Sequence, residues 1–163
     1  MASFTVKVFE GTIAQVVALS SIMTIISGMG GILIKEILER NLTVAKSANN
    51  LILSPNNSLD VLRKFLLQNN FVIEKEDDVI ENKKYYQILK VKRGKDFYRN
   101  DYEYLYGKLL IKNKSENLKL FLENELKKYR DIIDKISIES KNNKRIIEIT
   151  NLINKIRGIL DEF

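Results

Sequence analysis

The feature that most constrains the fold is a short apolar run that stops at a cluster of glycines. Residues 22–27 read Ile-Met-Thr-Ile-Ile-Ser, and Gly28-Met29-Gly30-Gly31 follow at once. A short run rich in β-branched residues predicts a buried strand of a parallel sheet. The glycines then favour a turn, because they adopt backbone conformations that other residues avoid. A helix over about 32–41 is predicted next, since apolar residues recur on one of its faces.

The same pattern then repeats further along the chain. Residues 50–54 read as a second apolar strand, and residues 55–57 as a turn. Ser58 is a suitable N-cap for the helix predicted over about 59–69, because a serine hydroxyl can accept a hydrogen bond from a free amide at a helix start. Two strands that each lead into a helix are typical of an α/β sheet.

Two extended runs follow, Phe71-Val72-Ile73 with its polar continuation and residues 85–91, around a polar turn near 81–83. They predict an antiparallel hairpin. From residue 22 the order is therefore strand, helix, strand, helix and hairpin. This order is that of the closing half of an open α/β sheet whose last strands are antiparallel.

Beyond residue 96 the pattern changes to one of helices. After an aromatic and polar stretch over 97–106, two apolar series recur at steps of three and four residues, joined near 138–143. Such heptad-like series predict an antiparallel helical hairpin that packs as a coiled coil. The two series are Leu118, Leu122, Leu126, Tyr129, Ile133 and Ile136, and Ile146, Ile149, Ile153, Ile156 and Leu160.

Composition excludes several classes of site. The chain has no cysteine and no histidine, which rules out disulfides, thiolate or histidine metal sites and the commonest general base. We therefore expect no metal. The net charge of +6 suits a nucleic-acid partner, although the basic residues are spread along the chain and are also compatible with an ordinary solvated surface.

A second interpretation concerns the uncharged stretch over residues 11–34, whose length would span a bilayer. Its polar residues and its three close glycines argue against a continuous helix, so we expect a strand, a glycine loop and a helix start there. Residues 4–8 alternate apolar and polar and predict a further half-buried strand.

Candidate functional residues follow both strands of the predicted sheet. Gly28, Met29, Gly30 and Gly31 come after the first strand, and Pro55 and Asn56 after the second. The carboxyl ends of parallel strands meet at the sheet edge where ligands bind. The glycine run matches neither a dinucleotide fingerprint nor a Walker A motif, so it could bring backbone amides to a cofactor or target base, or only make a tight strand-to-helix connection. Asn56 could bond a base or cofactor edge, or only close a turn or cap a helix.

The helical part offers candidates for RNA contact. The aromatics over 97–106, with Lys95 and Arg99 beside them, could stack on RNA bases or cover a joint between domains. On the helices, the outward basic residues could contact phosphates or simply be solvated. These residues are Lys127, Lys128, Lys144 and Arg145.

Several segments in register resemble the TrmK family of tRNA adenine-N1 methyltransferases. Ile25-Ile26-Ser27-Gly28-Met29-Gly30-Gly31 is similar to the family's I-A-G-M-G-G strand and turn, and Leu51-Ile52-Leu53-Ser54-Pro55-Asn56 to its L-I-L-Q-P-N strand. Ser54 stands where glutamine is usual. Further matching segments lie at residues 62–66, 71–76, 84–89 and 106–110, where Lys108 replaces a usual proline. The similarity as a whole runs over about residues 22–163.

The resemblance implies a Rossmann-like methyltransferase domain followed by a coiled-coil domain, in a cytoplasmic enzyme. It implies S-adenosylmethionine as cofactor and tRNA as partner, with residues 28–31 and Asn56 on the target-base side of the site. It divides the chain into a weakly matched segment at 1–21, a partial methyltransferase domain at 22–95 and the coiled coil at 96–163.

The family's first two strands, with the acidic loops that hold the cofactor, have no counterpart in the sequence. We therefore expect an incomplete enzyme that self-associates or needs a complementing N-terminal fragment. The alternatives are a non-catalytic RNA-binding protein and a coiled-coil interaction protein attached to a membrane through residues 11–34.

Overall fold

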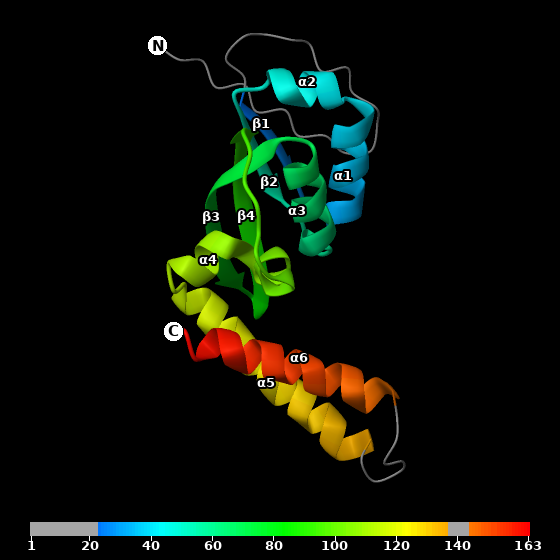
Figure 1. The fold of residues 1–163 in the computed structure, drawn as a ribbon, viewed down its shortest axis with the longest axis vertical. Helices are drawn as coiled ribbons and strands as arrows, with labels where there is room; N and C mark the ends of the chain where they lie inside the picture. The colour runs from blue at the N-terminus through cyan, green and yellow to red at the C-terminus, as the bar shows by residue number, and fades with distance from the viewer. Residues whose placement is uncertain (1–22, 137–143) are drawn as a thin grey trace. The chain divides into compact units, whose positions relative to one another are not determined.

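The computed structural model describes residues 23–136 and 144–163, which form two compact units that divide between Leu109 and Leu110. The first unit contains a four-stranded sheet with helices, and the second contains a pair of helices (Figure 1). The strand predicted over residues 4–8, like the whole N-terminal segment 1–21, lies outside the described residues.

The sheet has the strand order β1-β2-β4-β3. The strands β1 and β2 are parallel, whereas β4 is antiparallel to both of its neighbours. The predicted mixed α/β sheet, with antiparallel strands at its end, is thereby confirmed. The strands are β1 (Met23–Ser27), β2 (Asn50–Ser54), β3 (Phe71–Glu81) and β4 (Lys84–Arg93).

Three helices complete the sheet unit's regular structure up to β3. The helix α1 (Gly31–Arg40) follows the glycine turn as predicted, and α3 (Leu59–Gln68) follows β2. Between them lies α2 (Leu42–Ser47), a short helix that the sequence pattern did not predict.

The predicted capping role of Ser58 is wrong. Ser58 does precede α3, but its φ of 52° places it in the left-handed region and its side chain makes no capping hydrogen bond. Its hydroxyl donates instead to Asn57 Oδ1 at 3.1 Å. An N-cap residue whose side chain accepts the capping hydrogen bond typically has an extended backbone. Ser58 does not adopt this conformation.

The predicted hairpin between β3 and β4 is confirmed. Asn82 and Lys83 form a two-residue turn in which both residues have positive φ, at 50° and 63°. This geometry matches the right-handed twist of the flanking strands. The pairing shifts between Ile73 and Lys75, so Glu74 is an extra residue in a β-bulge.

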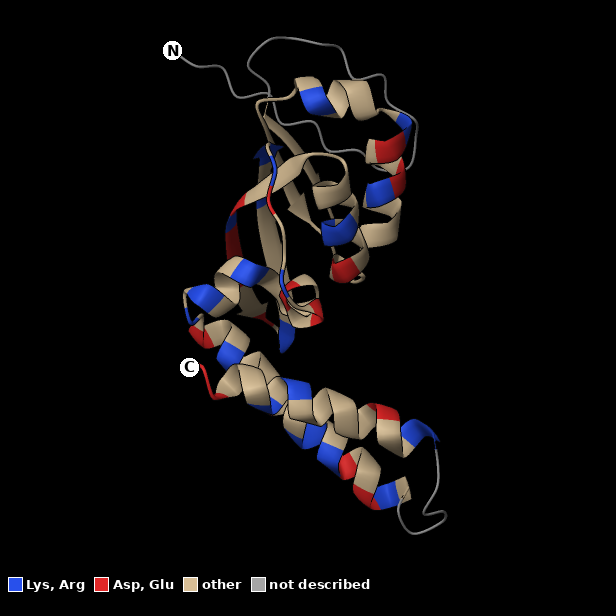
Figure 2. Ribbon diagram, in the orientation of Figure 1, with Lys and Arg blue, Asp and Glu red and all other residues tan. Residues whose placement is uncertain are grey.

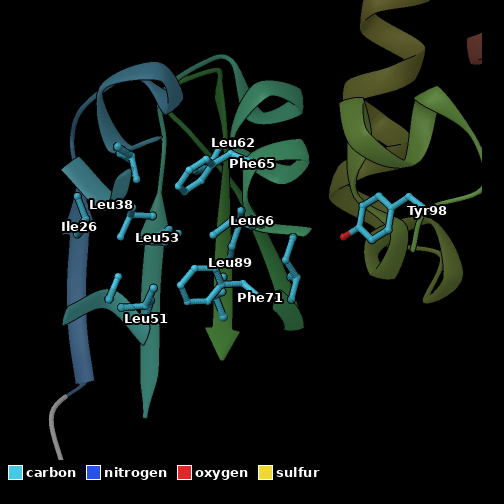
Figure 3. Packing of buried hydrophobic residues seen from close by; sticks show 14 residues of the cluster. Ile26, Leu38, Leu51, Leu53, Leu62, Phe65, Leu66, Phe71, Leu89 and Tyr98 are labelled. Carbon is cyan, nitrogen blue, oxygen red and sulfur yellow. The ribbon is translucent and has the colours of Figure 1, made fainter. Parts of the chain in front are cut away.

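The core of the sheet unit lies between one face of the sheet and the helices α1 and α3 (Figure 3). Alternate strand residues such as Leu51 and Leu53 meet Leu62 and Leu66 of α3, and all four side chains are at most 2% exposed. At roughly 1.5–3 kcal/mol for each large apolar side chain buried, this contact dominates the stability of the unit.

Residues 94–109 lie with the sheet unit. Tyr98 is buried in its core and packs against Tyr104 at a ring-centroid distance of 4.9 Å. A short π-helix, η1 (Glu103–Gly107), leads into α4 (Lys108–Lys112). The sequence placed the start of the helical domain at residue 96, which assigned the aromatic stretch 97–106 to the helices. In the structure this stretch is part of the sheet unit.

The second unit is a pair of helices, α5 (Glu116–Ile136) and α6 (Lys144–Leu160), which lie in contact and run in opposite directions (Figure 1). Leu118 and Leu122 of α5 are buried, as predicted. On α6 the seam ends at Ile159, which is 1% exposed, rather than at the predicted Leu160, which is half-buried. The other buried seam residues of α6 are Ile149, Ile153 and Ile156.

Within the described residues, no helix is both long and apolar enough to cross a membrane. Residues 23–34 of the uncharged stretch form β1, the glycine turn and the start of α1. The part of the membrane interpretation that depended on these residues therefore has no support in the fold.

Candidate functional site

The glycine loop between β1 and α1 contains three glycines in different surroundings. Gly28 has a φ of 78°, a conformation that disfavours any side chain, and space around its Cα is open. Gly31 is packed tightly, because a Cβ there would lie 2.4 Å from the Ser58 carbonyl oxygen. Gly30 is intermediate, since a Cβ there would meet the Asn57 side chain at 2.7 Å. Backbone conformation at Gly28 and close packing at Gly30 and Gly31 thus explain why each position is a glycine.

The loops that follow β1 and β2 lie side by side, as the sequence predicted. The Asn56 N–H donates to the Met29 carbonyl, and the Gly31 N–H donates to the Asn57 carbonyl, both at 2.9 Å. These two hydrogen bonds hold the loops together directly beyond the carboxyl ends of parallel strands. This is the position at which open α/β sheets bind ligands.

The side chains around the joined loops are mostly neutral. Pro55 is buried and supports the turn, whereas Asn56 is exposed and presents an amide to solvent. The helix after the turn begins beyond Ser58, so Asn56 is not its N-cap. Residues 27–34 and 54–59 contain no charged residue. The loops therefore offer backbone amides, backbone carbonyls and the two exposed carboxamides of Asn56 and Asn57 for recognition.

A buried polar cluster, which sequence reasoning missed, lies elsewhere in the sheet unit. Arg63 of α3 is completely buried and pairs with Glu76 of β3 at 2.7 Å between Nη2 and Oε1. Arg63 Nη2 also donates to Gln87 Oε1 of β4 at 2.6 Å. The three residues are far apart in sequence and no local pattern links them, so only the fold reveals the cluster.

Two tyrosines at this cluster have pKa values raised above the ordinary range. Burial is the main cause for Tyr85, and its hydrogen bond with Asp78, at 2.8 Å, adds to the effect. Burial is also the main cause for Tyr98, followed by the charge of Glu76. Both phenols therefore stay protonated, and of the two it is Tyr85 whose hydroxyl donates a hydrogen bond, to Asp78.

The aromatic stretch over 97–106 separates into buried and exposed residues. Tyr98 lies in the core, which leaves its ring unavailable for stacking on RNA. Phe97 is 67% exposed, and the Lys108 ammonium lies 5.5 Å from its ring centroid. Base stacking by this stretch thus stays a prediction for the exposed Phe97 and for the half-buried Tyr102, Tyr104 and Tyr106.

The predicted phosphate-contacting residues lie on the surface of the helical unit, where Lys and Arg alternate with acidic residues (Figure 2). Lys127, Lys128, Lys144 and Arg145 are all exposed. Lys128 pairs with Glu125 at 3.1 Å, and Arg145 lies 3.6 Å from Glu148. Burial raises the pKa of the Tyr129 phenol on α5, and the charge of Arg145 on α6 opposes this larger rise.

Among residues 23–136 and 144–163, no group of acidic side chains is arranged to hold a metal ion.

Comparison with known proteins decides the family. The family model TrmK, described as tRNA (adenine(22)-N(1))-methyltransferase, matches residues 13–158. The chain belongs to the TrmK family. Its glycine loop, both parallel strands, the helix α5 and all but the last two residues of α6 lie inside the matched range. A comparison with curated proteins found no match.

Solved structures agree with the TrmK assignment. The chain is 31% identical to Streptococcus pneumoniae Sp1610, described as a candidate tRNA (m1A22) methyltransferase, with a TM-score of 0.78 over 85% of the chain. It is 29% identical to M. capricolum TrmK in complex with S-adenosyl-homocysteine, with a TM-score of 0.72 over 86% of the chain. The chain spans 61% of the first structure and 60% of the second.

The described loops can be tested against the cofactor of TrmK relatives. A nucleoside cofactor in a Rossmann-type crevice is commonly held by a carboxylate on its ribose. The joined loops carry no carboxylate, as residues 27–34 and 54–59 show. They offer neutral hydrogen-bonding groups and no carboxylate for a ribose.

Proposed function

We propose that this chain provides the target-base side of a tRNA adenine-N1 methyltransferase site. The residues are Gly28, Met29, Gly30 and Gly31 of the first loop, with Pro55 and Asn56 of the second. The observation that carries the proposal is the pair of 2.9 Å hydrogen bonds between these loops, in a chain of the TrmK family.

The chemistry asked of these loops is positioning. N1 of adenine is already a nucleophile, and S-adenosylmethionine supplies an electrophilic methyl group. The chain's own residues must hold the base out of the stack with N1 correctly directed. The open backbone at Gly28 admits a base closely, and the exposed Asn56 amide can both donate and accept a hydrogen bond at its edge. We assign the cofactor no contact with these loops.

The helical unit would hold the tRNA. The seam of α5 and α6 fits a two-stranded coiled coil. The outward residues that would neutralise tRNA phosphates are Lys127, Lys128, Lys144 and Arg145. We place this tRNA modification in the cytoplasm. Each contact of this kind adds affinity without adding sequence information. Recognition of the target adenine would therefore depend on the loops of the sheet unit.

The test uses an unmodified tRNA with 2-aminopurine in place of adenine 22. Fluorescence of this base rises when it leaves the stack, so binding by the chain should increase it. Gly31→Ala should abolish the increase, because the new Cβ would lie 2.4 Å from the Ser58 carbonyl oxygen and separate the loops. Gly158→Ala is the matched control, since no atom lies within 4 Å of the Cβ it adds.

Each outcome selects one function. A rise that Gly31→Ala removes and Gly158→Ala preserves supports the target-base role. Binding of tRNA without any rise would leave a non-catalytic RNA-binding protein, and no binding at all would leave an interaction protein. Isothermal titration should show no micromolar binding of S-adenosylmethionine, and such binding would contradict our assignment of the cofactor contacts.

The sheet edge at β1 suggests a further partner. Among the described strands, β1 pairs on one side only, with β2. An edge strand with free amides and carbonyls readily adds another strand. We expect either a second copy of the chain or a complementing N-terminal fragment to pair there. A monodisperse monomer in light scattering would count against self-association.

A further inference from the structure

We propose that Arg63 is a positioning residue that fastens residues 103–109 to the sheet, and that this latch fixes the point from which the chain enters the tRNA-holding helices. The latch consists of Arg63, Glu76 and Gln87 with the backbone of residues 104–109. Its effect on tRNA rests on the proposed function, whereas its effect on residues 103–109 does not.

All three guanidinium nitrogens of Arg63 donate hydrogen bonds, and the acceptors come from three different elements. Nε donates to Glu76 Oε1 of β3 at 2.9 Å, and Nη2 donates to Gln87 Oε1 of β4 at 2.6 Å. Nη1 donates to the Tyr104 carbonyl of η1 at 2.8 Å. Arg63 therefore joins the helix α3 to the sheet and to the π-helical segment with one rigid group.

The two partners of Arg63 also bind the same segment. Glu76 Oε2 accepts the Leu109 N–H at 2.7 Å, and Gln87 Nε2 donates to the Tyr106 carbonyl at 3.1 Å. The three buried side chains thus hold backbone groups at 104, 106 and 109. A π-helix is rare and occurs mostly as a single turn, and here three buried side chains bind the backbone of that turn and of the residues that follow it.

Gly107 shows how closely the segment is held. Its φ is 101°, and a Cβ added there would lie 2.9 Å from both Arg63 Nη2 and Glu76 Oε2. The backbone therefore passes directly over the buried ion pair, with no room for a side chain. This contact offers a way to displace the segment while all the polar groups of the sheet remain.

The chemistry of the cluster favours positioning over simple stabilisation. A buried ion pair gains little net stability, because the loss of hydration offsets most of the attraction, and apolar residues of similar volume often serve the core as well. Apolar residues cannot bind the carbonyls and the amide of residues 104–109. The polar cluster is thus needed for the segment, not for the sheet.

The test measures hydrogen–deuterium exchange in the whole chain. Gly107→Ala should speed exchange in residues 103–109 roughly tenfold or more by local opening, while the hairpin 71–93 keeps its protection. Affinity for unmodified tRNA should fall by a similar factor. Gly158→Ala is the control and should change neither quantity. The double variant Arg63→Met with Glu76→Leu removes the latch by a different route and should reproduce the Gly107→Ala pattern.

The outcomes separate the latch from the proposed function. Unchanged exchange in residues 103–109 of both variants would overturn the latch, and so would faster exchange throughout 71–93, which would show that the cluster holds the sheet itself. Faster local exchange with full tRNA affinity would overturn the positioning role. If the unaltered chain fails to bind tRNA, the proposed function fails, and the exchange pattern still decides whether the latch exists.

Discussion

The two units of this chain treat polar groups in opposite ways. The buried polar and charged side chains among the described residues are Arg63, Glu76 and Gln87, and all three lie in the sheet unit. The buried side chains of the helical unit are aliphatic, such as Leu118 and Ile156. An aliphatic seam brings two helices together and tolerates small shifts, whereas a buried polar cluster requires one arrangement of its partners. The contrast predicts that the two units respond differently to substitution.

The largest effect should come from breaking the polar cluster on one side. Arg63→Met leaves the Glu76 carboxylate buried without its partner, which should lower the free energy of unfolding of the sheet unit by about 3–5 kcal/mol. Urea denaturation followed by circular dichroism measures this loss. Lys64→Met, at the exposed neighbouring position, is the matched control. Equal losses in the two variants would show that the buried polar cluster is no more sensitive to substitution than the surface, and the contrast between the units would fail.

A smaller effect is expected in the aliphatic seam. Leu122 is fully buried in α5, and Leu122→Ala should cost about 3 kcal/mol through lost burial and the cavity left behind. The loss should appear as faster hydrogen exchange in α5 and α6, with the sheet unit unchanged. Leu120→Ala, on the same helix at a residue that is 48% exposed, should have little effect. Exchange that rises in both units together would show that they unfold as one.

The smallest effect concerns an exposed charge cluster on the sheet. Hydrogen bonds from Lys90 and Lys92 lower the pKa of Glu74 from 4.5 to about 2. Because the pKa is lower in the folded state, this contribution to stability is present above pH 4.5 and is lost as the pH falls towards 2.

In Glu74→Gln the thermal unfolding midpoint should therefore fall less between these two pH values than in the unaltered chain. The difference should shrink in high salt, since the group is exposed and its interactions are screened. An identical pH dependence in both proteins would exclude the assigned role of Glu74.

The same contrast explains which parts of the fold the sequence predicts. The strands β1 and β2, the glycine turn and the helical seam depend on residues a few positions apart, and their patterns indicated them correctly. Arg63 meets partners 13, 24 and 41 residues away, so no periodicity identifies it as buried. The end of the α6 seam was one residue off, because a step of three from Ile156 reaches Ile159 as readily as a step of four reaches Leu160.

The position of the candidate site could also be predicted from the sequence, because it depends on the order of strands and helices. Parallel strands place their carboxyl ends at one edge, so the adjacency of the Gly28–Gly31 loop and Asn56 followed from the order of elements. The two hydrogen bonds that join the loops, and the left-handed backbone of Ser58, depend on backbone geometry that side-chain patterns do not encode. Those details set how tightly the loops are held.

The most direct test of the account is the affinity for unmodified tRNA over a series of salt concentrations. The unaltered chain should bind more weakly as salt rises. Reversing the charges of Lys127, Lys128, Lys144 and Arg145 together should reduce the slope of log affinity against log salt by roughly 3. Charge reversal at Lys83 and Lys84, in the exposed hairpin turn, should leave the slope unchanged. Equal slopes in all three proteins, or no binding by the unaltered chain, would contradict the proposal that the helical unit holds tRNA.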